Sequence, residues 1–374
     1  MVNKKITMIS CTNSLKHWFC YLIIAWPFWV NAQTKNNQAK LPYITASFHY
    51  ASTFKFNKSA NDLNVSYPIG IELQYTKQLR DEKSWQQNNC YFNSGIGLNY
   101  FNYNNALLGE SMALFYVFEP QFKLGKKLKF LASANLGLTF LSNPYNQNNN
   151  ATNSYYSLPV SAYLAFGTGL EYPLNKNFQM SLLAKFIHIS NGGTQEPNKG
   201  INMASVNLRL SYNPIDNHLE KFIKKTEKLV LKDRLDFGLY VSNKNLGVNE
   251  PDRYFIFGAM ANYSKQVSSI NALTGGIEII ADQVTQARLQ RDKLDKSSLR
   301  LGLLVGHEFL FRKFSVNQQL GYYLINETTY FNDLYQRIGL SYFASANISI
   351  GFSVLTHTTV PNFTDLRLTY YIRK

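Results

Sequence analysis

Charged residues, cysteines and long apolar runs are all scarce in this chain, and each shortage excludes a class of protein. Charged residues occupy only 16% of 374 positions, well below the share in an ordinary soluble domain. With three cysteines, Cys11, Cys20 and Cys90, the chain has neither a disulfide framework nor a metal–thiolate motif. The apolar run Trp18–Val30 has 13 residues, whereas a membrane-spanning helix needs about 20. If the protein sits in a membrane, it must therefore cross with strands.

Aromatic residues are plentiful instead. The chain has 25 tyrosines and 26 phenylalanines, 45% hydrophobic residues and a mean hydropathy of -0.23. A transmembrane β-barrel needs this combination, because its outer face is apolar, its interior is polar and aromatic girdles mark both membrane interfaces. The composition therefore favours an all-β fold, a transmembrane antiparallel β-barrel.

The first 32 residues have the parts of a secretory signal peptide. Lysines precede the apolar run, and Val30–Ala32 fits a small-residue cleavage site before Gln33. A membrane-anchor helix is the alternative, and the shortness of the run argues against it. Cleavage would leave Cys90 as the one cysteine. It would also lower the formal charge from +15 to +12, since residues 1–32 hold three lysines and no acidic residue.

This basic charge points to an anionic partner. An exported protein rarely meets nucleic acid, so we expect no nucleic-acid partner, and a phosphorylated glycolipid of the membrane surface is favoured instead. No motif indicates a metal or a cofactor, and we expect neither.

Strand-like segments of about ten residues, the length of a tilted membrane strand, recur through residues 41–213. The alternation is clear where Ser94, Ile96 and Leu98 share one face of a predicted strand. We predict eight strands in this half, at residues 43–54, 67–78, 92–103, 111–123, 127–141, 158–172, 177–190 and 201–212.

Residues 234–374 repeat this rhythm. Between the halves, residues 214–233 include a basic stretch with apolar residues at helical spacing, which predicts a short amphipathic helix. That helix either lies on the membrane surface or links two barrels. The insertion favours two tandem eight-stranded barrels over a single sixteen-stranded barrel with a water-filled lumen. We predict eight strands in the second half, at residues 234–243, 253–265, 271–282, 298–311, 314–325, 333–342, 345–356 and 363–372.

His188 and Ser190 lie two residues apart near the end of the seventh predicted strand, so both side chains point to the same face. Apolar or small residues continue this face through Phe186, Ala184 and Leu182, which predicts that it faces lipid. Because this strand runs outward, the pair is expected at the depth of the outer leaflet. Unpaired polar groups are costly there. A serine nucleophile and a histidine base aimed at a lipid ester would account for them.

The residues that follow suit acyl transfer. Asn191, Gly192 and Gly193 can turn backbone amides toward an oxyanion, and Asn198 can add a side-chain donor. By themselves these are ordinary loop residues. Beside a histidine and a serine on a lipid-facing strand, they favour catalysis.

The string HISNGGTQEPNKGIN, which begins at His188, resembles the active-site signature of the PagL-like lipid A 3-O-deacylases. These acyloxyacyl-hydrolase-type proteins are eight-stranded barrels of the Gram-negative outer membrane, and they hydrolyse an ester of lipid A. The resemblance covers residues 41–213 as architecture, and the specific motif spans about fifteen residues. It implies that Ser190 is the nucleophile and His188 the general base. It also implies an oxyanion hole built with Asn191, Gly193 and Asn198.

One position departs from the family's pattern. The family places a glutamate fourteen residues after the histidine, and this chain has Asn202 there. An asparagine can accept a hydrogen bond from the histidine and hold its tautomer, but it does not stabilise an imidazolium by charge. Glu196, in the same loop, and Glu171, near the end of the sixth predicted strand, are alternative acids.

The second half keeps a histidine at His357 but has Thr358 and Thr359 after it and lacks the Asn-Gly-Gly sequence. We therefore expect it to be catalytically silent. The sequence as a whole predicts an outer-membrane esterase that removes an ester-linked acyl chain from the lipid A of lipopolysaccharide. A non-enzymatic structural or porin-like barrel is the alternative, and the oligomeric state is left open.

Overall fold

Sixteen β-strands and one α-helix make up the regular elements described here. The computed structural model describes residues 40–54, 65–80, 85, 90–215, 231, 233–311, 313–358 and 360–373. The predicted signal peptide at residues 1–32 lies outside them, as does most of the predicted linker helix, residues 216–230 and 232. Among the described residues, no helix is both long enough and apolar enough to cross a membrane.

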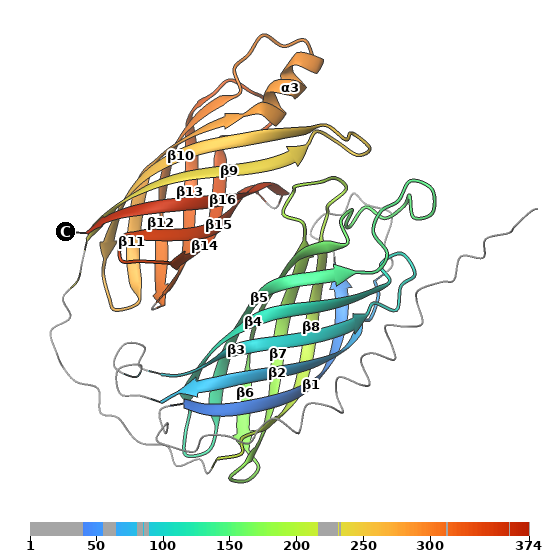
Figure 1. Ribbon diagram of the computed structural model, residues 1–374, viewed down its shortest axis with the longest axis vertical. Helices are drawn as coiled ribbons and strands as arrows, with labels where there is room; N and C mark the ends of the chain where they lie inside the picture. The colour runs from blue at the N-terminus through green and yellow to red at the C-terminus, as the bar shows by residue number, and fades with distance from the viewer. Residues whose placement is uncertain are drawn as a thin grey trace, which may run out of the picture. The chain divides into compact units, whose positions relative to one another are not determined.

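The first eight strands close into one antiparallel barrel. Each strand pairs with the next, and β8 pairs back with β1 (Figure 1). The strands are β1 (Lys40–Phe54), β2 (Ile69–Leu79), β3 (Tyr91–Asn102), β4 (Glu110–Lys123), β5 (Lys129–Leu141), β6 (Val160–Pro173), β7 (Phe178–Ser190) and β8 (Ile201–Tyr212).

The last eight strands close into a second barrel with the same order, in which β16 pairs back with β9 (Figure 1). Two closed barrels exclude the alternative of a single sixteen-stranded barrel. The strands are β9 (Arg234–Asn245), β10 (Arg253–Gln266), β11 (Asn271–Asp282), β12 (Leu299–Phe311), β13 (Phe314–Asn326), β14 (Leu334–Phe343), β15 (Ile348–His357) and β16 (Val360–Arg373). Both barrels belong to one compact unit, Ala39–Lys374.

The two faces of each strand are buried in the opposite sense to those of a soluble protein: apolar side chains are exposed and polar ones are buried. On β2, Ile71 and Leu73 are 49% and 43% exposed, while the intervening Glu72 is only 2% exposed. On β16 of the second barrel, Leu368 is 54% exposed and Arg367 only 7%. Apolar side chains therefore cover the outer walls and polar ones fill the interiors, which is the pattern of a barrel that stands in lipid.

Ion pairs and hydrogen bonds fill both interiors. In the first barrel, Glu72 lies 3.2 Å from Lys185 Nζ, and Arg209 Nη1 donates to Glu119 at 2.6 Å. In the second barrel, Arg337 lies between two carboxylates, Glu278 at 2.8 Å and Asp365 at 2.7 Å. Buried charges are tolerated when they are paired in this way.

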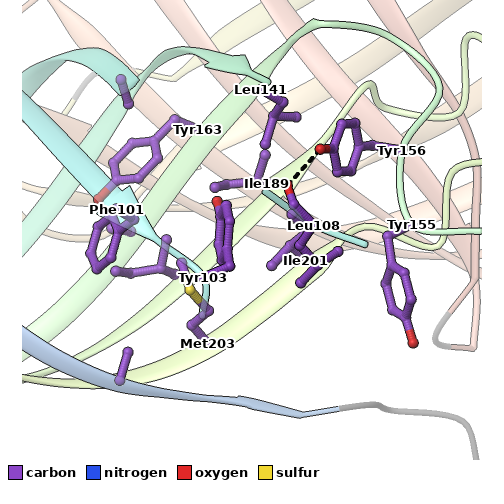
Figure 2. Packing of buried hydrophobic residues seen from close by; sticks show 14 of the residues in the cluster. Phe101, Tyr103, Leu108, Leu141, Tyr155, Tyr156, Tyr163, Ile189, Ile201 and Met203 are labelled. Carbon is purple, nitrogen blue, oxygen red and sulfur yellow. Dashed lines mark hydrogen bonds between the residues drawn. The ribbon is translucent and has the colours of Figure 1, made fainter. Parts of the chain in front are cut away.

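An apolar cluster fills the first barrel at the end where β7 finishes and β8 begins. Figure 2 shows Ile189 of β7 with Ile201 and Met203 of β8 in this cluster. The hydroxyl of Tyr156 donates to the carbonyl of Leu108 at 2.7 Å and ties a connecting loop to it. The interior of the barrel is therefore tightly packed behind the residues that β7 and β8 present on the outer side at this end.

Helix α3 (Gln283–Arg291) was not predicted; it lies between the strands predicted at residues 271–282 and 298–311. Its sequence, QVTQARLQR, has few apolar residues, so it shows no clear amphipathic pattern. The helix forms because Asp282 caps its first turn, accepting from the Thr285 amide at 2.9 Å. Two apolar residues of the helix, Val284 and Leu289, are buried.

Candidate active site

His188 and Ser190 stand together at the end of β7. The distance between His188 Nε2 and Ser190 Oγ is 2.9 Å, which is within hydrogen-bonding reach. They alternate with Ile187 and Ile189, both fully buried inside the barrel. The alternation therefore places the histidine and the serine on the outer side of the wall, with the apolar cluster behind them.

Asn202 completes a chain of three polar side chains. The pairing of β7 with β8 sets Asn202 directly opposite His188, and Asn202 Oδ1 lies 2.7 Å from His188 Nδ1. An amide oxygen only accepts, so Nδ1 carries the proton and Nε2 is free to accept from the Ser190 hydroxyl. This is the order that a nucleophile, a base and a group orienting the base require.

The loop after Ser190 is shaped by Asn191. Its side-chain oxygen accepts from the amides of Gly193 at 3.0 Å and Thr194 at 3.1 Å, and its side-chain nitrogen donates to the Gln195 carbonyl at 2.7 Å. The turn leaves the Gly192 amide 3.4 Å from Ser190 Oγ. Gly192 therefore offers the backbone donor nearest to the serine among the hydrogen bonds of this loop.

Asn198 and Glu196 also hold the loop. Asn198 Oδ1 accepts from the Asn191 amide at 3.0 Å, and Glu196 Oε2 accepts from the Asn198 amide at 3.1 Å. The sequence-predicted acid position, Asn202, contacts the histidine, whereas Glu196 contacts the loop backbone. The other alternative acid, Glu171, faces the barrel interior and pairs with Lys129 at 2.8 Å.

Two residues of the site were missed by the sequence analysis. Gly200 has φ of +74°, and a Cβ on it would lie 2.9 Å from His188 Cε1. Ser157 bridges the loop, accepting from Asn191 at 3.3 Å and donating to the Gln195 carbonyl at 3.0 Å. A glycine just before a strand was a visible signal for the first, but nothing in the sequence marked the second.

Apolar side chains surround the polar chain on the outer wall. Phe54 is the strand partner of Asn202, Leu164 is the partner of His188, and the rings of Phe54 and Phe186 lie 5.8 Å apart. A reacting ester carbonyl at Ser190 would thus have hydrocarbon on either side, as an acyl chain requires.

The second barrel arranges its histidine differently. His357 Nε2 lies 3.4 Å from the Tyr323 hydroxyl, and its ring stacks on Phe331 with centroids 4.7 Å apart. Thr359, two residues on, lies outside the described residues. That this half is catalytically silent stays a prediction.

Two family models match the chain. Residues 69–211 match the family model described as lipid A 3-O-deacylase (PagL), and residues 233–374 match that of the acyloxyacyl hydrolase C-terminal domain. Fold and matches together define the class, an ester hydrolase of the Gram-negative outer membrane. More specifically, the first barrel is a PagL-like lipid A 3-O-deacylase domain, and the second matches the C-terminal domain of acyloxyacyl hydrolase.

Solved structures of outer-membrane proteins are similar to parts of the chain. Neisserial surface protein A is 12% identical over 46% of this chain and 96% of its own, with a TM-score of 0.34. The outer membrane enzyme PagL is 20% identical over 44% and 97%, with a TM-score of 0.33. The attachment invasion locus protein Ail of Yersinia pestis is 13% identical over 47% and 99%, with a TM-score of 0.28. No curated protein matches the chain significantly in sequence.

Proposed function

We propose that this outer-membrane lipid A deacylase uses Ser190 as its nucleophile and His188 as its general base. The observation that carries the proposal is the hydrogen-bonded order Asn202, His188, Ser190 on the outer wall, with distances of 2.7 Å and 2.9 Å. The substrate is lipid A, whose acyl esters lie at the depth of this wall and whose phosphates suit the basic chain.

The reaction proceeds in two half-reactions. Ser190 Oγ attacks the ester carbonyl carbon while His188 Nε2 takes its proton, and the bond from that carbon to the lipid A alcohol then breaks. His188 returns the proton to the leaving alkoxide. Water next attacks the acyl-serine ester, His188 takes a proton from this water and passes it to Ser190 Oγ, and a free fatty acid leaves.

The Gly192 amide and the side-chain NH₂ of Asn198 are the proposed oxyanion donors. Asn191 and Gly193 take part by shaping the turn, since the Gly193 amide donates to Asn191 Oδ1. Donors that are already fixed before the substrate arrives stabilise the tetrahedral intermediate without reorganisation.

Replacing Ser190 by alanine tests the nucleophile. Because the hydroxyl supplies the bond-forming atom, Ser190→Ala is expected to lower deacylation by at least about 1000-fold. The measurement is mass spectrometry of lipid A from cells that express each variant. Ser47→Ala is the matched control, since the buried Ser47 Oγ has no hydrogen-bond partner among the residues that the structure describes. Deacylation that persists in Ser190→Ala removes this serine from the mechanism.

A further inference from the structure

Three backbone groups of the loop 191–200 are bonded by residues of the second barrel. The Gly192 carbonyl accepts from the Thr364 hydroxyl at 2.8 Å. The Thr194 carbonyl accepts from the backbone N–H of Asn245 at 3.3 Å. The backbone N–H of Glu196 donates to the side-chain oxygen Oδ1 of Asn245 at 3.0 Å. The bonded groups are two residues apart along the loop, so the whole turn after Ser190 is held at regular intervals.

The contact at Gly192 is close enough to need glycine. Gly192 has φ of +70°, and a Cβ on it would lie 2.2 Å from Thr364 Oγ1. Gly193, with φ of +78°, passes so near that its Cβ would lie 3.1 Å from the Asn362 carbonyl oxygen. The two glycines that the sequence analysis linked to the oxyanion therefore also fit against the second barrel.

The residues that hold the loop are themselves fixed. Ser242 of β9 donates to the Thr364 carbonyl at 2.6 Å, and Lys244 Nζ donates to the Asn362 carbonyl at 2.9 Å. Asn245 Nδ2 donates to the Gly247 carbonyl at 2.7 Å. The ends of β9 and β16 that meet the loop lie beyond their mutual strand pairing, which starts at Val241 and Leu366, and the bonds from Ser242 and Lys244 tie these two ends together.

We infer that the second barrel is a positioning element for catalysis, in which Thr364 and Asn245 fix the peptide planes around Gly192. This inference rests on the proposed role of Ser190. Two consecutive glycines would otherwise allow the turn many conformations, few of which aim the Gly192 amide at the oxyanion. Holding the carbonyl of Gly192 restricts its ψ, and the bonds at Thr194 and Glu196 restrict the rest of the turn. The second barrel would act in this way without a catalytic group of its own.

The test replaces the Thr364 hydroxyl in the full-length protein. Thr364→Val keeps the shape but loses the donor, so kcat for hydrolysis of lipopolysaccharide in detergent micelles is expected to fall about tenfold, with KM little changed. Thr364→Ser, which keeps the hydroxyl, is expected to restore kcat. Heat-modifiable migration on gels reports whether each variant is folded. Thr356→Val, at the same end of the adjacent strand β15, is the control and is expected to keep wild-type kcat.

The outcomes separate this inference from the proposed function. Wild-type kcat in folded Thr364→Val overturns the positioning role, while an inactive Ser190→Ala still supports the nucleophile. Activity retained in Ser190→Ala overturns the proposed function itself. If Thr364→Val does not fold, Asn245→Ala and Asn245→Asp decide the matter. A loss of kcat in the alanine variant that aspartate reverses supports the positioning role, and wild-type kcat in the alanine variant overturns it.

Discussion

At the residue scale, the proposed mechanism depends on which nitrogen of His188 carries the proton. Asn202 Oδ1 lies 2.7 Å from Nδ1, so the amide oxygen selects the tautomer in which Nε2 accepts from Ser190. Asparagine performs this orienting role in enzymes with a Cys-His-Asn arrangement. Asparagine lacks the negative charge that stabilises an imidazolium, so in the proposed mechanism Asn202 supplies geometry and not electrostatic stabilisation.

Restoring a carboxylate at position 202 is therefore expected to increase the rate. Asn202→Glu should raise kcat by about tenfold or more, because a carboxylate both orients the histidine and stabilises its charged form. Asn202→Leu should lower kcat, since neither contribution remains. Steady-state hydrolysis of purified lipopolysaccharide measures both. A glutamate variant slower than the leucine variant would contradict the orienting role.

A substitution at Gly200 should also change kcat, in this case for a steric reason. A methyl group at Gly200 would lie 2.9 Å from His188 Cε1 and 3.1 Å from the Ile189 carbonyl, on a backbone with φ of +74°. We expect Gly200→Ala to displace the imidazole and lower kcat by about tenfold or more. Gly125→Ala is a suitable comparison, since no atom of the described part of the chain lies within 4 Å of a Cβ at Gly125. Equal kcat in the two variants would show that the close approach is unimportant.

Some site residues could be predicted from the sequence and others could not. His188 and Ser190 were accessible because the two-residue period of a strand puts both on one face. Ser157 and Thr364 were not, because they reach the loop from 38 and 172 residues away. Local spacing carries no information on such contacts, which depend on how strands and loops are brought together.

At the scale of elements, the strands were predicted well and the helix was missed. Predicted and observed strand ends differ by at most three residues, because lipid outside and polar side chains inside impose alternation along every strand. Helix α3 has no comparable requirement. It depends on Asp282, whose carboxylate caps the first turn and also pairs with the buried Arg300.

Cys90 lies just before β3, and its reactivity tests how tightly the start of this strand is packed. It lies outside the membrane-spanning strands and is 6% exposed, and burial raises the pKa of its thiol to about 11. Since only the thiolate reacts, alkylation by a maleimide at pH 8 should be very slow in the folded protein and fast after denaturation. Intact-mass spectrometry follows the adduct. Rapid labelling of folded protein would show that this end is open.

At the scale of the whole molecule, two closed and filled barrels replace one wide pore. The interiors hold ion pairs such as Glu72 with Lys185 and Arg337 with Asp365. An eight-stranded barrel has little room beyond its own side chains. A porin-like role would need a continuous water-filled lumen.

We therefore expect no steady conductance from the purified protein in planar lipid bilayers. A sixteen-stranded porin is the positive control in the same membranes. Large, lasting conductance steps from this protein would contradict the filled interiors and favour a channel.

The central claim is that Ser190 attacks the ester with help from His188. Its most direct test is covalent labelling of the full-length protein with a long-chain fluorophosphonate, followed by peptide mass spectrometry. The account predicts one phosphonate on Ser190, inhibition of deacylation in step with labelling, and little labelling in His188→Ala. Complete inhibition with Ser190 unmodified, or equal labelling without the histidine, would contradict it.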